Sequence, residues 1–531
     1  MCGILITNQK GVSVGDFEKN LQLLKHRGPD ASGVDQEGEW LLGHTRLKIL
    51  DLDDRSNQPF FSKDGRYVMV YNGEVYNYRE LASQYGLSCQ TSGDTEVVME
   101  LYALLGPRML QELNGMFAIT IIDRMSNDVF VARDRLGIKP VYIREEKGEI
   151  IICSEIAPIL ELRPQVEYDL IGLRQYAKLR VFFNGRTAYQ GIEMLQAGHY
   201  WLNGRRVKYW DLPEGEQKPP SDEELKDLIE TAVRRRCISD VEVGSYLSGG
   251  LDSTIIAGLA DKPHTWTVGF DGYNEFEWAR VAANEFGSQH HEVGIQREEF
   301  LEIAKSMVRE RREPLSVPNE VLLFRMTQEV KKHNRVVLSG EGADELFFGY
   351  DRIFRWASEA KTWDIQEFSD RYSYGVHDDL EVLEDVMAPF VAEGRSPLDI
   401  VARFFQIAHL HGLLRRVDNS TMRCSVEARV PFIDHELVER MAGVSASYRM
   451  ADGIVKAPLK RVFESLIPEG IRTRKKIGFP VPLEEIFFGR ASEQGGPKRD
   501  ALDRWLKFNL EHLTGEKLSL QDLGLGKSAK N

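Results

Sequence analysis

The second residue of the chain is a cysteine, in the sequence Met1-Cys2-Gly3-Ile4. Once Met1 is removed, a thiol and a free α-amino group lie on one residue. An α-amino group has a pKa of about 7.7–8.0, so near neutral pH part of it is free base and can accept the thiol proton. The position predicts a cysteine nucleophile. The alternative is that Cys2 is only a small residue in a first strand. The motifs that accompany Cys2 decide between the two interpretations.

Polar residues farther along the chain supply the groups that hydrolysis of glutamine requires. Arg46 can bind an α-carboxylate bidentately, and Glu74 and Asp94 can bind an α-ammonium group. The side-chain amide of Asn72 and the backbone N–H of Gly73 can form an oxyanion hole for a tetrahedral intermediate. Each motif also has a local explanation, because Asn-Gly is a hairpin signal and Gly-Asp before a helix is a cap. Together with the cysteine they predict a glutaminase site.

A second group of motifs indicates phosphate chemistry. Ser-Gly-Gly-Leu-Asp-Ser at 248–253 follows a predicted strand and begins a predicted helix. Its glycines let backbone N–H groups point inward, and the helix N-terminus adds a positive dipole end, so the loop can bind an anion. It is not a Walker A loop, because GxxxxGK[ST] is absent.

Carboxylates accompany this loop. Asp252 and Asp344, the latter in Ser-Gly-Glu-Gly-Ala-Asp-Glu at 339–345, could share Mg²⁺ beside phosphate oxygens. A capped helix start explains the second loop equally well on its own. The charged residues of 425–434, Lys456 and the basic run 474–476 are predicted to meet developing pyrophosphate charge.

The elements that position these motifs change character near residue 211. The first part predicts an α+β layered domain, with strands at 67–71, 117–122, 129–132 and 150–153 and a helix at 94–105. Residues 211–222, rich in proline and charge, predict a linker. The second part predicts a doubly wound parallel sheet, with strands at 241–247, 264–268 and 335–338 and helices that begin near 252 and 275.

The first 210 residues resemble the class II glutamine amidotransferase domain. The resemblance rests on Met1-Cys2-Gly3-Ile4, the blocks 26–30, 72–74, 93–94 and 133–142, and Ser154-Glu155. It implies an αββα N-terminal-nucleophile hydrolase sandwich over residues 2–210. It also implies Cys2 as nucleophile, Asn72 and Gly73 as the oxyanion hole, and a glutamine site of Arg46, Asn72, Gly73, Glu74 and Asp94. Ala157 departs from the family's usual lysine.

Residues 222–490 resemble the synthetase domain of glutamine-hydrolysing asparagine synthetases, an ATP pyrophosphatase fold with added helices. The matches are 248–253, 268–270, 290–292, 339–345 and 426–434. The resemblance implies Mg²⁺–pyrophosphate binding by Asp252 and Asp344, transition-state stabilisation by Lys456, and a carboxylate, Glu341, beside an acyl-adenylate. The implied ATP site consists of Leu247, Ser248, Gly249, Gly250, Asp252, Ser253, Val268, Ser339 and Gly340. Phe348 stands where the family usually has glycine, and a bulky ring expected on the substrate side of this loop leaves the acceptor open.

The two resemblances predict a two-site amidotransferase. Glutamine is hydrolysed at Cys2, a carboxylate is adenylated by Mg·ATP, and ammonia travels internally, because in water at neutral pH it would be protonated. Aspartate is the simplest acceptor. A sugar uronate, a peptide carboxylate or an antibiotic precursor is the alternative. A catalytically silent glutamine-binding regulator is a third reading, which the retained catalytic residues disfavour.

Composition and charge limit the classes of protein to which the chain can belong. The chain has 531 residues, 42% hydrophobic and 28% charged, as in ordinary globular proteins. A net charge of −14 disfavours binding to nucleic acid or an anionic membrane. No run approaches the roughly 18 apolar residues of a membrane span. Five scattered cysteines predict a reduced, cytoplasmic protein. The family resemblance implies a homodimer, and residues 491–531 are expected to form a polar, frayed tail.

Overall fold

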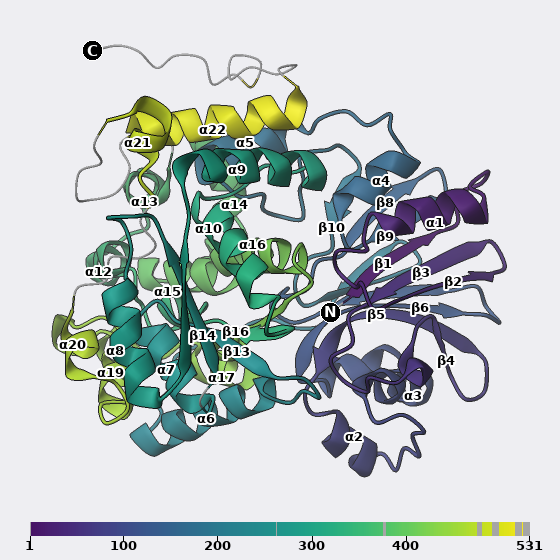
Figure 1. Cartoon of the computed structure of the whole chain (residues 1–531), viewed down its shortest axis with the longest axis horizontal. Helices are drawn as coiled ribbons and strands as arrows, with labels where there is room; N and C mark the ends of the chain where they lie inside the picture. Colours follow the sequence, from purple (N-terminus) through teal and green to yellow (C-terminus); the bar gives the residue numbers. More distant parts are fainter. Residues whose placement is uncertain are drawn as a thin grey trace.

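The computed structural model describes residues 2–261, 263–374, 379–474, 481–490, 499–515 and 523. Two units lie side by side, the N-terminal one on the right in Figure 1 and the C-terminal one on the left. The stretch between them, from the end of strand β12 at Lys208 to the start of helix α6 at Asp222, contains no helix or strand. Among the described residues, no helix combines the length and apolar character needed to cross a bilayer.

Two six-stranded sheets form the N-terminal unit. The first has the order β10-β8-β9-β1-β3-β2. Its strands are β1 (Cys2–Thr7), β2 (Ala31–Glu37), β3 (Trp40–Arg46), β8 (Tyr142–Glu146), β9 (Glu149–Cys153) and β10 (Ile192–Met194). The second has the order β12-β11-β7-β6-β5-β4. Its strands are β4 (Phe60–Phe61), β5 (Tyr67–Val75), β6 (Gly115–Asp123), β7 (Val129–Arg133), β11 (His199–Leu202) and β12 (Arg205–Lys208). The strand pairs of both sheets are antiparallel.

Alternation along the strands explains how these sheets stack. Ile4 and Val70 belong to the buried cluster between the sheets, whereas Leu5 and Met69, one position away, pack outward. Helices α1 (Val14–Gln22) and α4 (Ile156–Leu162) cover the first sheet, and α3 (Asp94–Leu105) covers the second, beside α2 (Tyr78–Gln84). The strands are apolar on both faces because both faces are buried. The predicted αββα sandwich is confirmed.

A five-stranded parallel sheet organises the C-terminal unit, in the order β15-β14-β13-β16-β17. Its strands are β13 (Val243–Tyr246), β14 (His264–Gly269), β15 (Gln289–Gly294), β16 (Val336–Leu338) and β17 (Glu427–Arg429). Val336 and Leu338 pack with α6 (Asp222–Arg236), α7 (Leu251–Leu259) and α8 (Phe276–Phe286), whereas Val337 packs with α9 (Arg297–Arg311) and α10 (Asn319–Val330). The predicted doubly wound sheet is confirmed. Its strand order reverses between β13 and β16, where α/β sheets bind ligands at their carboxyl ends.

The chain after β16 is mainly helical. It contains α11 (Ala343–Leu346), α12 (Asp351–Glu359), α13 (Ile365–Tyr372), α14 (Leu380–Met387), α15 (Pro397–Phe404), a π-helical turn (Phe405–His409), α16 (Leu410–Met422), α17 (His435–Met441), α18 (Ala446–Arg449), α19 (Ala457–Val462), α20 (Glu469–Thr473) and α21 (Leu483–Phe488). In the N-terminal unit α5 (Leu170–Leu179) packs against α14.

The segment predicted as a frayed polar tail contains an ordered helix. Helix α22 (Arg499–Thr514) packs against α9 and α21, and Trp505 and Leu506 are fully buried. The expectation of fraying is therefore wrong for these residues. Apolar side chains occupy one face of an amphipathic helix here, and the charged residues between them gave the segment its polar average.

Candidate active sites

The first site forms where β1 and β5 meet. Cys2 is buried, and its backbone nitrogen donates a 2.9 Å hydrogen bond to Oδ1 of Asn72. Cys2 also stands opposite Arg46 in the β1–β3 ladder. The packing of the two sheets against each other, with β1 against β5, therefore brings together residues that are 70 positions apart in the chain. The predicted nucleophile and one predicted oxyanion donor share a hydrogen bond.

Asn72 and Gly73, the predicted oxyanion donors, both lie in close-packed surroundings on β5. Asn72 is fully buried, and its Nδ2 has no hydrogen-bond partner within the described parts of the chain. A buried donor without a partner is costly, so it fits a group that a substrate satisfies. A Cβ at Gly73 would lie 2.2 Å from the carbonyl oxygen of Met116, so only glycine fits this position of β5.

Two buried carboxylates lie beside these donors. Asp94 Oδ2 accepts hydrogen bonds from the Tyr71 hydroxyl, at 2.7 Å, and from the Val75 N–H, at 2.8 Å. Burial and the neighbouring carboxylates of Asp94 and Glu427 raise the pKa of Glu74 well above its ordinary value. Burial also raises the pKa of Asp94. An ammonium group that arrives here would relieve the repulsion, which fits the predicted role in holding glutamine.

Arg46 differs from its predicted role as a free bidentate clamp. Its Nη1 donates to the Asp53 carbonyl and to Asn57 Oδ1, both at 2.8 Å, and its Nη2 donates to the carbonyls of Leu50 and Asp51. All four Nη hydrogens are therefore used by one loop. As seated, Arg46 orders residues 50–57, and bidentate binding of a carboxylate would require it to release some of these bonds.

Arg27 supports the backbone of the nucleophile. Its Nε donates to the Cys2 carbonyl at 3.1 Å, while its Nη groups bind Glu155, at 3.0 Å, and Asp418 of α16, at 2.9 Å. Both units thus hold the start of β1. Ala157, where a lysine was expected, lies half-buried in the first turn of α4, two residues after Glu155.

The second site forms at the reversal point of the parallel sheet. The loop after β13 is closed by Ser248 and Ser253, whose hydroxyl oxygens are 3.1 Å apart, and the Ser248 N–H donates to the Ser253 hydroxyl. Gly249 has a φ of 69°, and a Cβ there would lie 2.5 Å from the backbone of Trp278. The loop leads into the N-terminus of α7, as an anion-binding loop requires.

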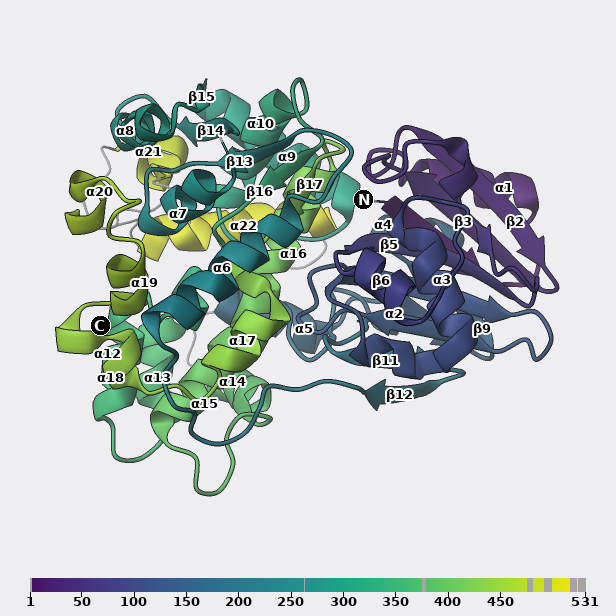
Figure 2. The ribbon, with the colours of Figure 1, turned by 90° about the horizontal axis from the view of Figure 1, so that it is seen from below.

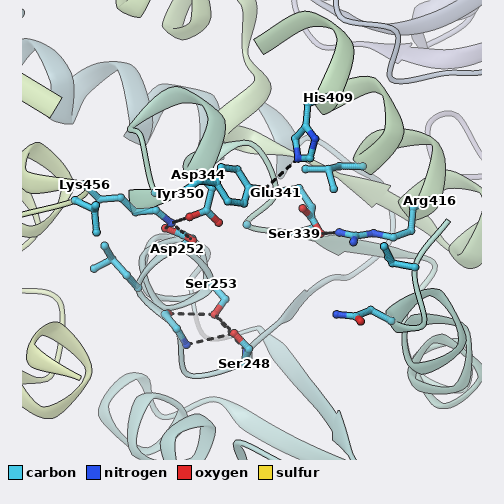
Figure 3. Close-up of a pocket in the computed structure, with 18 of the residues that line it drawn as sticks. Ser248, Asp252, Ser253, Ser339, Glu341, Asp344, Tyr350, His409, Arg416 and Lys456 are labelled. Atoms are coloured by element: carbon cyan, nitrogen blue, oxygen red, sulfur yellow. Dashed lines mark hydrogen bonds and ion pairs between the residues drawn. The ribbon is translucent and has the colours of Figure 1, made fainter. Parts of the chain in front are cut away.

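Lys456 lies between the two predicted metal ligands (Figure 3). Its Nζ is 2.6 Å from Asp252 Oδ2 and 2.6 Å from Asp344 Oδ1. The two carboxylates converge on one cation, so their donor set fits the sharing of Mg²⁺. Gly349 makes this arrangement possible, because a Cβ there would lie 2.4 Å from the Lys456 side chain.

A cavity of about 880 Å³ connects these groups. Of the predicted ATP-site and catalytic residues, those that line it are Ser248, Gly250, Asp252, Ser253, Val268, Ser339, Gly340, Glu341, Asp344 and Lys456. Leu247 and Gly249 are not among the lining residues. Leu247 is fully buried below the loop, and its N–H donates to the Trp266 carbonyl at 2.8 Å.

The cavity also has residues that the sequence did not predict. Arg416 of α16 binds Glu341, with Nη2 and Oε1 2.7 Å apart (Figure 3). His409 closes the π-helical turn, and its Nδ1 and the Tyr372 hydroxyl share a 2.9 Å hydrogen bond. Tyr350 also lines the cavity. A single arginine or histidine in a helical region has no motif around it, so only the fold could reveal these residues. π-Helical turns frequently occur at functional sites.

Phe348 points away from this cavity, contrary to the expectation of a ring on its substrate side. The ring is 1% exposed, stacks on Phe354 at 4.1 Å between centroids, and lies under the Arg449 guanidinium. Its φ of 57° is the left-handed conformation that glycine adopts without strain. The departure at this position therefore concerns packing and backbone strain.

The charged residues expected near pyrophosphate lie in two different parts of the structure, the cavity and the interface with the N-terminal unit. Arg474 lines the cavity and pairs with Glu275. Lys475 and Lys476 lie outside the described residues. The expectation is wrong for Arg429 and Asp434, which face the N-terminal unit: Arg429 lies beside Glu74, and Asp434 accepts from the Asn114 side chain.

Comparison with known families agrees with the two sites. A family model described as a glutamine amidotransferase domain matches residues 1–210, and one described as asparagine synthase matches residues 224–494. The fold and these matches define a two-domain glutamine amidotransferase with an N-terminal-nucleophile sandwich. The chain belongs to the asparagine synthase family. It is a glutamine-hydrolysing carbon–nitrogen ligase of that type, and the family uses ATP.

Similar proteins span most of the chain. A Mycobacterium tuberculosis (strain H37Rv) relative is 32% identical and covers 87% of this chain and 83% of its own length. Asparagine synthetase [glutamine-hydrolyzing] 1 of Bacillus subtilis is 28% identical over 87% of this chain and 83% of its own. Asparagine synthetase B [glutamine-hydrolyzing] of Escherichia coli K12 is 27% identical, with 86% and 77% covered.

Proposed function

We propose that the chain makes asparagine by transferring the amide nitrogen of glutamine to aspartate, driven by ATP. The names of its relatives support this acceptor, and the two sites supply the chemistry. At the first site, Cys2 Sγ attacks the carboxamide carbon and its proton passes to the α-amino group that removal of Met1 exposes. The amide nitrogen leaves as ammonia, and water hydrolyses the thioester to glutamate.

The residues around Cys2 each take one part of this reaction. Asn72 Nδ2 and the Gly73 N–H stabilise the oxyanion of the tetrahedral intermediate. Glu74 and Asp94 hold the α-ammonium group of glutamine. Arg46 orders the loop 50–57 and meets the α-carboxylate after partial release of that loop.

At the second site, an aspartate carboxylate oxygen attacks the α-phosphorus of ATP and pyrophosphate leaves. Asp252 and Asp344 would hold Mg²⁺, which neutralises phosphate charge when bound. Lys456 stabilises the charge that develops on the transferring group, and Glu341 lies beside the acyl-adenylate. Ammonia then attacks the acyl carbon, AMP leaves, and the product is an amide.

One observation carries the proposal: the ammonium group of Lys456 lies between Asp252 and Asp344 at the reversal point of the sheet, in a chain whose other unit pairs Cys2 with a partnerless Asn72 amide. The first motif alone indicates glutamine hydrolysis and the second alone indicates adenylation. Their combination supports ATP-driven amidation.

The test measures pyrophosphate release with ATP, Mg²⁺ and glutamine, with and without aspartate, and identifies the product by mass. The proposal predicts aspartate-dependent release matched one to one by asparagine. Glutaminase activity without aspartate-dependent release would contradict aspartate as acceptor and keep the chemistry. Parallel assays with a uronate and with peptide carboxylates then identify the alternative acceptor.

A further inference from the structure

Strand β17 of the C-terminal unit reaches the glutamine site of the N-terminal unit. It is an edge strand of the parallel sheet and lies on the side that faces the N-terminal unit (Figure 2). Glu427 and Arg429 on this strand are fully buried. Their side chains lie beside β5, which carries Asn72, Gly73 and Glu74. A second unit therefore contributes charged groups to the surroundings of the predicted glutamine site.

Arg429 is anchored within its own unit by two of its nitrogens. Nη1 donates to the carbonyls of Arg236, at 2.8 Å, and Ile238, at 2.6 Å, at the C-terminal end of α6, and Nε donates to Glu427 Oε1 at 2.5 Å. Nη2 has no hydrogen-bond partner in the part of the chain that the structure describes, and it lies 3.6 Å from Glu74 Oε1. The guanidinium thus presents its remaining donor across the interface.

Glu74 requires a cation for its proposed role. A carboxylate binds an ammonium group as an anion, yet Glu74 is buried, and its Oε2 has no hydrogen-bond partner among the described residues. The titratable and charged groups that face it are Asp94 of α3, Glu427 and Arg429 of β17, Tyr71 of β5, Tyr76 directly after β5, and the amino terminus of the chain. Arg429 is the side-chain cation among them and lowers the pKa of Glu74 more than the amino terminus does, whereas burial and the acids around Glu74 favour its protonated form.

We propose that Arg429 is a positioning residue of the glutamine site, supplied by the C-terminal unit, and that it keeps the Glu74 carboxylate ionised and aimed at the α-ammonium group of glutamine. This inference rests on the proposed function of the Cys2 site. The glutamine site is then complete only when the two units are docked. The same residue also contacts the second site, because its carbonyl oxygen accepts a 2.8 Å hydrogen bond from the Ser339 N–H.

The test compares R429Q and R429K with a matched control, R236Q, in glutaminase assays of the full chain. Arg236 is also buried at this interface and lies over the same Tyr76 ring, but it pairs with Asp434. R429Q is expected to raise the KM for glutamine at least about tenfold and to move the acid limb of kcat/KM to higher pH, with kcat changed less. R429K is expected to recover most of the loss, and R236Q to leave the KM within about twofold.

A double-mutant cycle with E74Q separates positioning from interface packing. If Arg429 acts through Glu74, R429Q adds little to the KM of E74Q. Additive effects, or equal losses in R429Q and R236Q, would overturn the inference, as would an unchanged KM in R429Q. Should R429Q fail to fold, the pH profile of R429K decides: it matches wild type if the charge matters. A wild-type chain without Cys2-dependent glutaminase activity would instead contradict the proposed function itself.

Discussion

The two sites are assembled in opposite ways. The glutamine site consists of side chains on strands of two stacked sheets: the β1–β3 ladder of one sheet sets Cys2 opposite Arg46, and β5 of the other sheet carries Asn72 and Glu74. The ATP site consists of loops at the carboxyl edge of a parallel sheet, around a cavity of about 880 Å³. Strand register and the packing of the two sheets set the positions of Cys2, Asn72 and Glu74, whereas the second site surrounds an open cavity. The nucleophile thus lies on a regular strand, whereas the second site is built from loops around a cavity.

Removal of the nucleophile is the strongest way to separate the two sites. Cys2→Ala is expected to lower glutamine-dependent turnover at least about 10³-fold, because no other group can form the thioester. Ammonia-dependent turnover should persist, since the second site takes ammonia directly. Both rates are measured as pyrophosphate release, and loss of both would contradict the independence of the sites.

Lys456→Ala is the complementary variant, because it is expected to disable the second site and to spare the first. The expected loss of amide synthesis is about 10²–10³-fold with either nitrogen source, because a buried cation no longer meets the transferring phosphoryl group. Glutaminase activity should remain measurable. The paired assay is glutamate formation against pyrophosphate release. Lys226→Ala, at an exposed position of α6 that does not line the cavity, is the control and should lose far less.

Phe348→Gly tests whether the residue at this position influences stability alone or also the choice of acceptor. The variant loses buried aromatic packing of about 3–5 kcal/mol but regains about 1–2 kcal/mol of left-handed backbone strain. The expected net loss in the free energy of unfolding is about 1–4 kcal/mol, measured by urea denaturation. The preferred acceptor should not change, because the ring does not line the cavity; a switch of acceptor would contradict that placement.

His44 gives the N-terminal unit a pH dependence of its own. It is buried, its Nε2 donates to the Tyr71 carbonyl at 3.2 Å, and burial lowers its pKa to about 3. A lowered pKa means that this contribution is full above the ordinary value of about 6.5 and is lost as the pH falls toward 3. Between pH 7 and 5 the loss is about 2 kcal/mol.

His44→Gln removes this titration while it keeps a donor for the Tyr71 carbonyl. The urea midpoint of the variant should therefore fall less than that of wild type between pH 7 and 5, measured in parallel. Identical slopes for the two proteins would show that His44 titrates normally in the fold.

Local patterns in the sequence were sufficient for much of the fold. The predicted helix 94–105 has the bounds of α3, and β7 and β9 extend the predicted strands by one residue each, because alternating and apolar runs report the buried faces directly. The Ser-Gly-Gly motif predicted the loop at the reversal point because its chemistry is contiguous in the chain. The local explanation of Asn72-Gly73 as a hairpin signal is wrong, because β5 continues through both residues to Val75.

Long-range contacts account for what the sequence did not predict. Arg416 reaches Glu341 from a helix 75 positions away, and Arg429 lies on a strand whose motif indicated phosphate chemistry but whose edge position turns it to the other unit. The sequence also did not predict the loop that binds Arg46. Most of its acceptors are backbone carbonyls, which every residue carries and which therefore leave no pattern in the sequence. Such partners depend on how the two units dock.

The most direct test of a coupled pair of sites follows the nitrogen. Glutamine labelled with ¹⁵N in its amide is supplied with ATP, Mg²⁺, aspartate and an excess of unlabelled ammonium, and the product amide is analysed by mass. The expected product amide is mainly ¹⁵N, because ammonia released at Cys2 passes inside the protein to the ATP site. An amide labelled only in proportion to free ammonium would contradict this internal transfer.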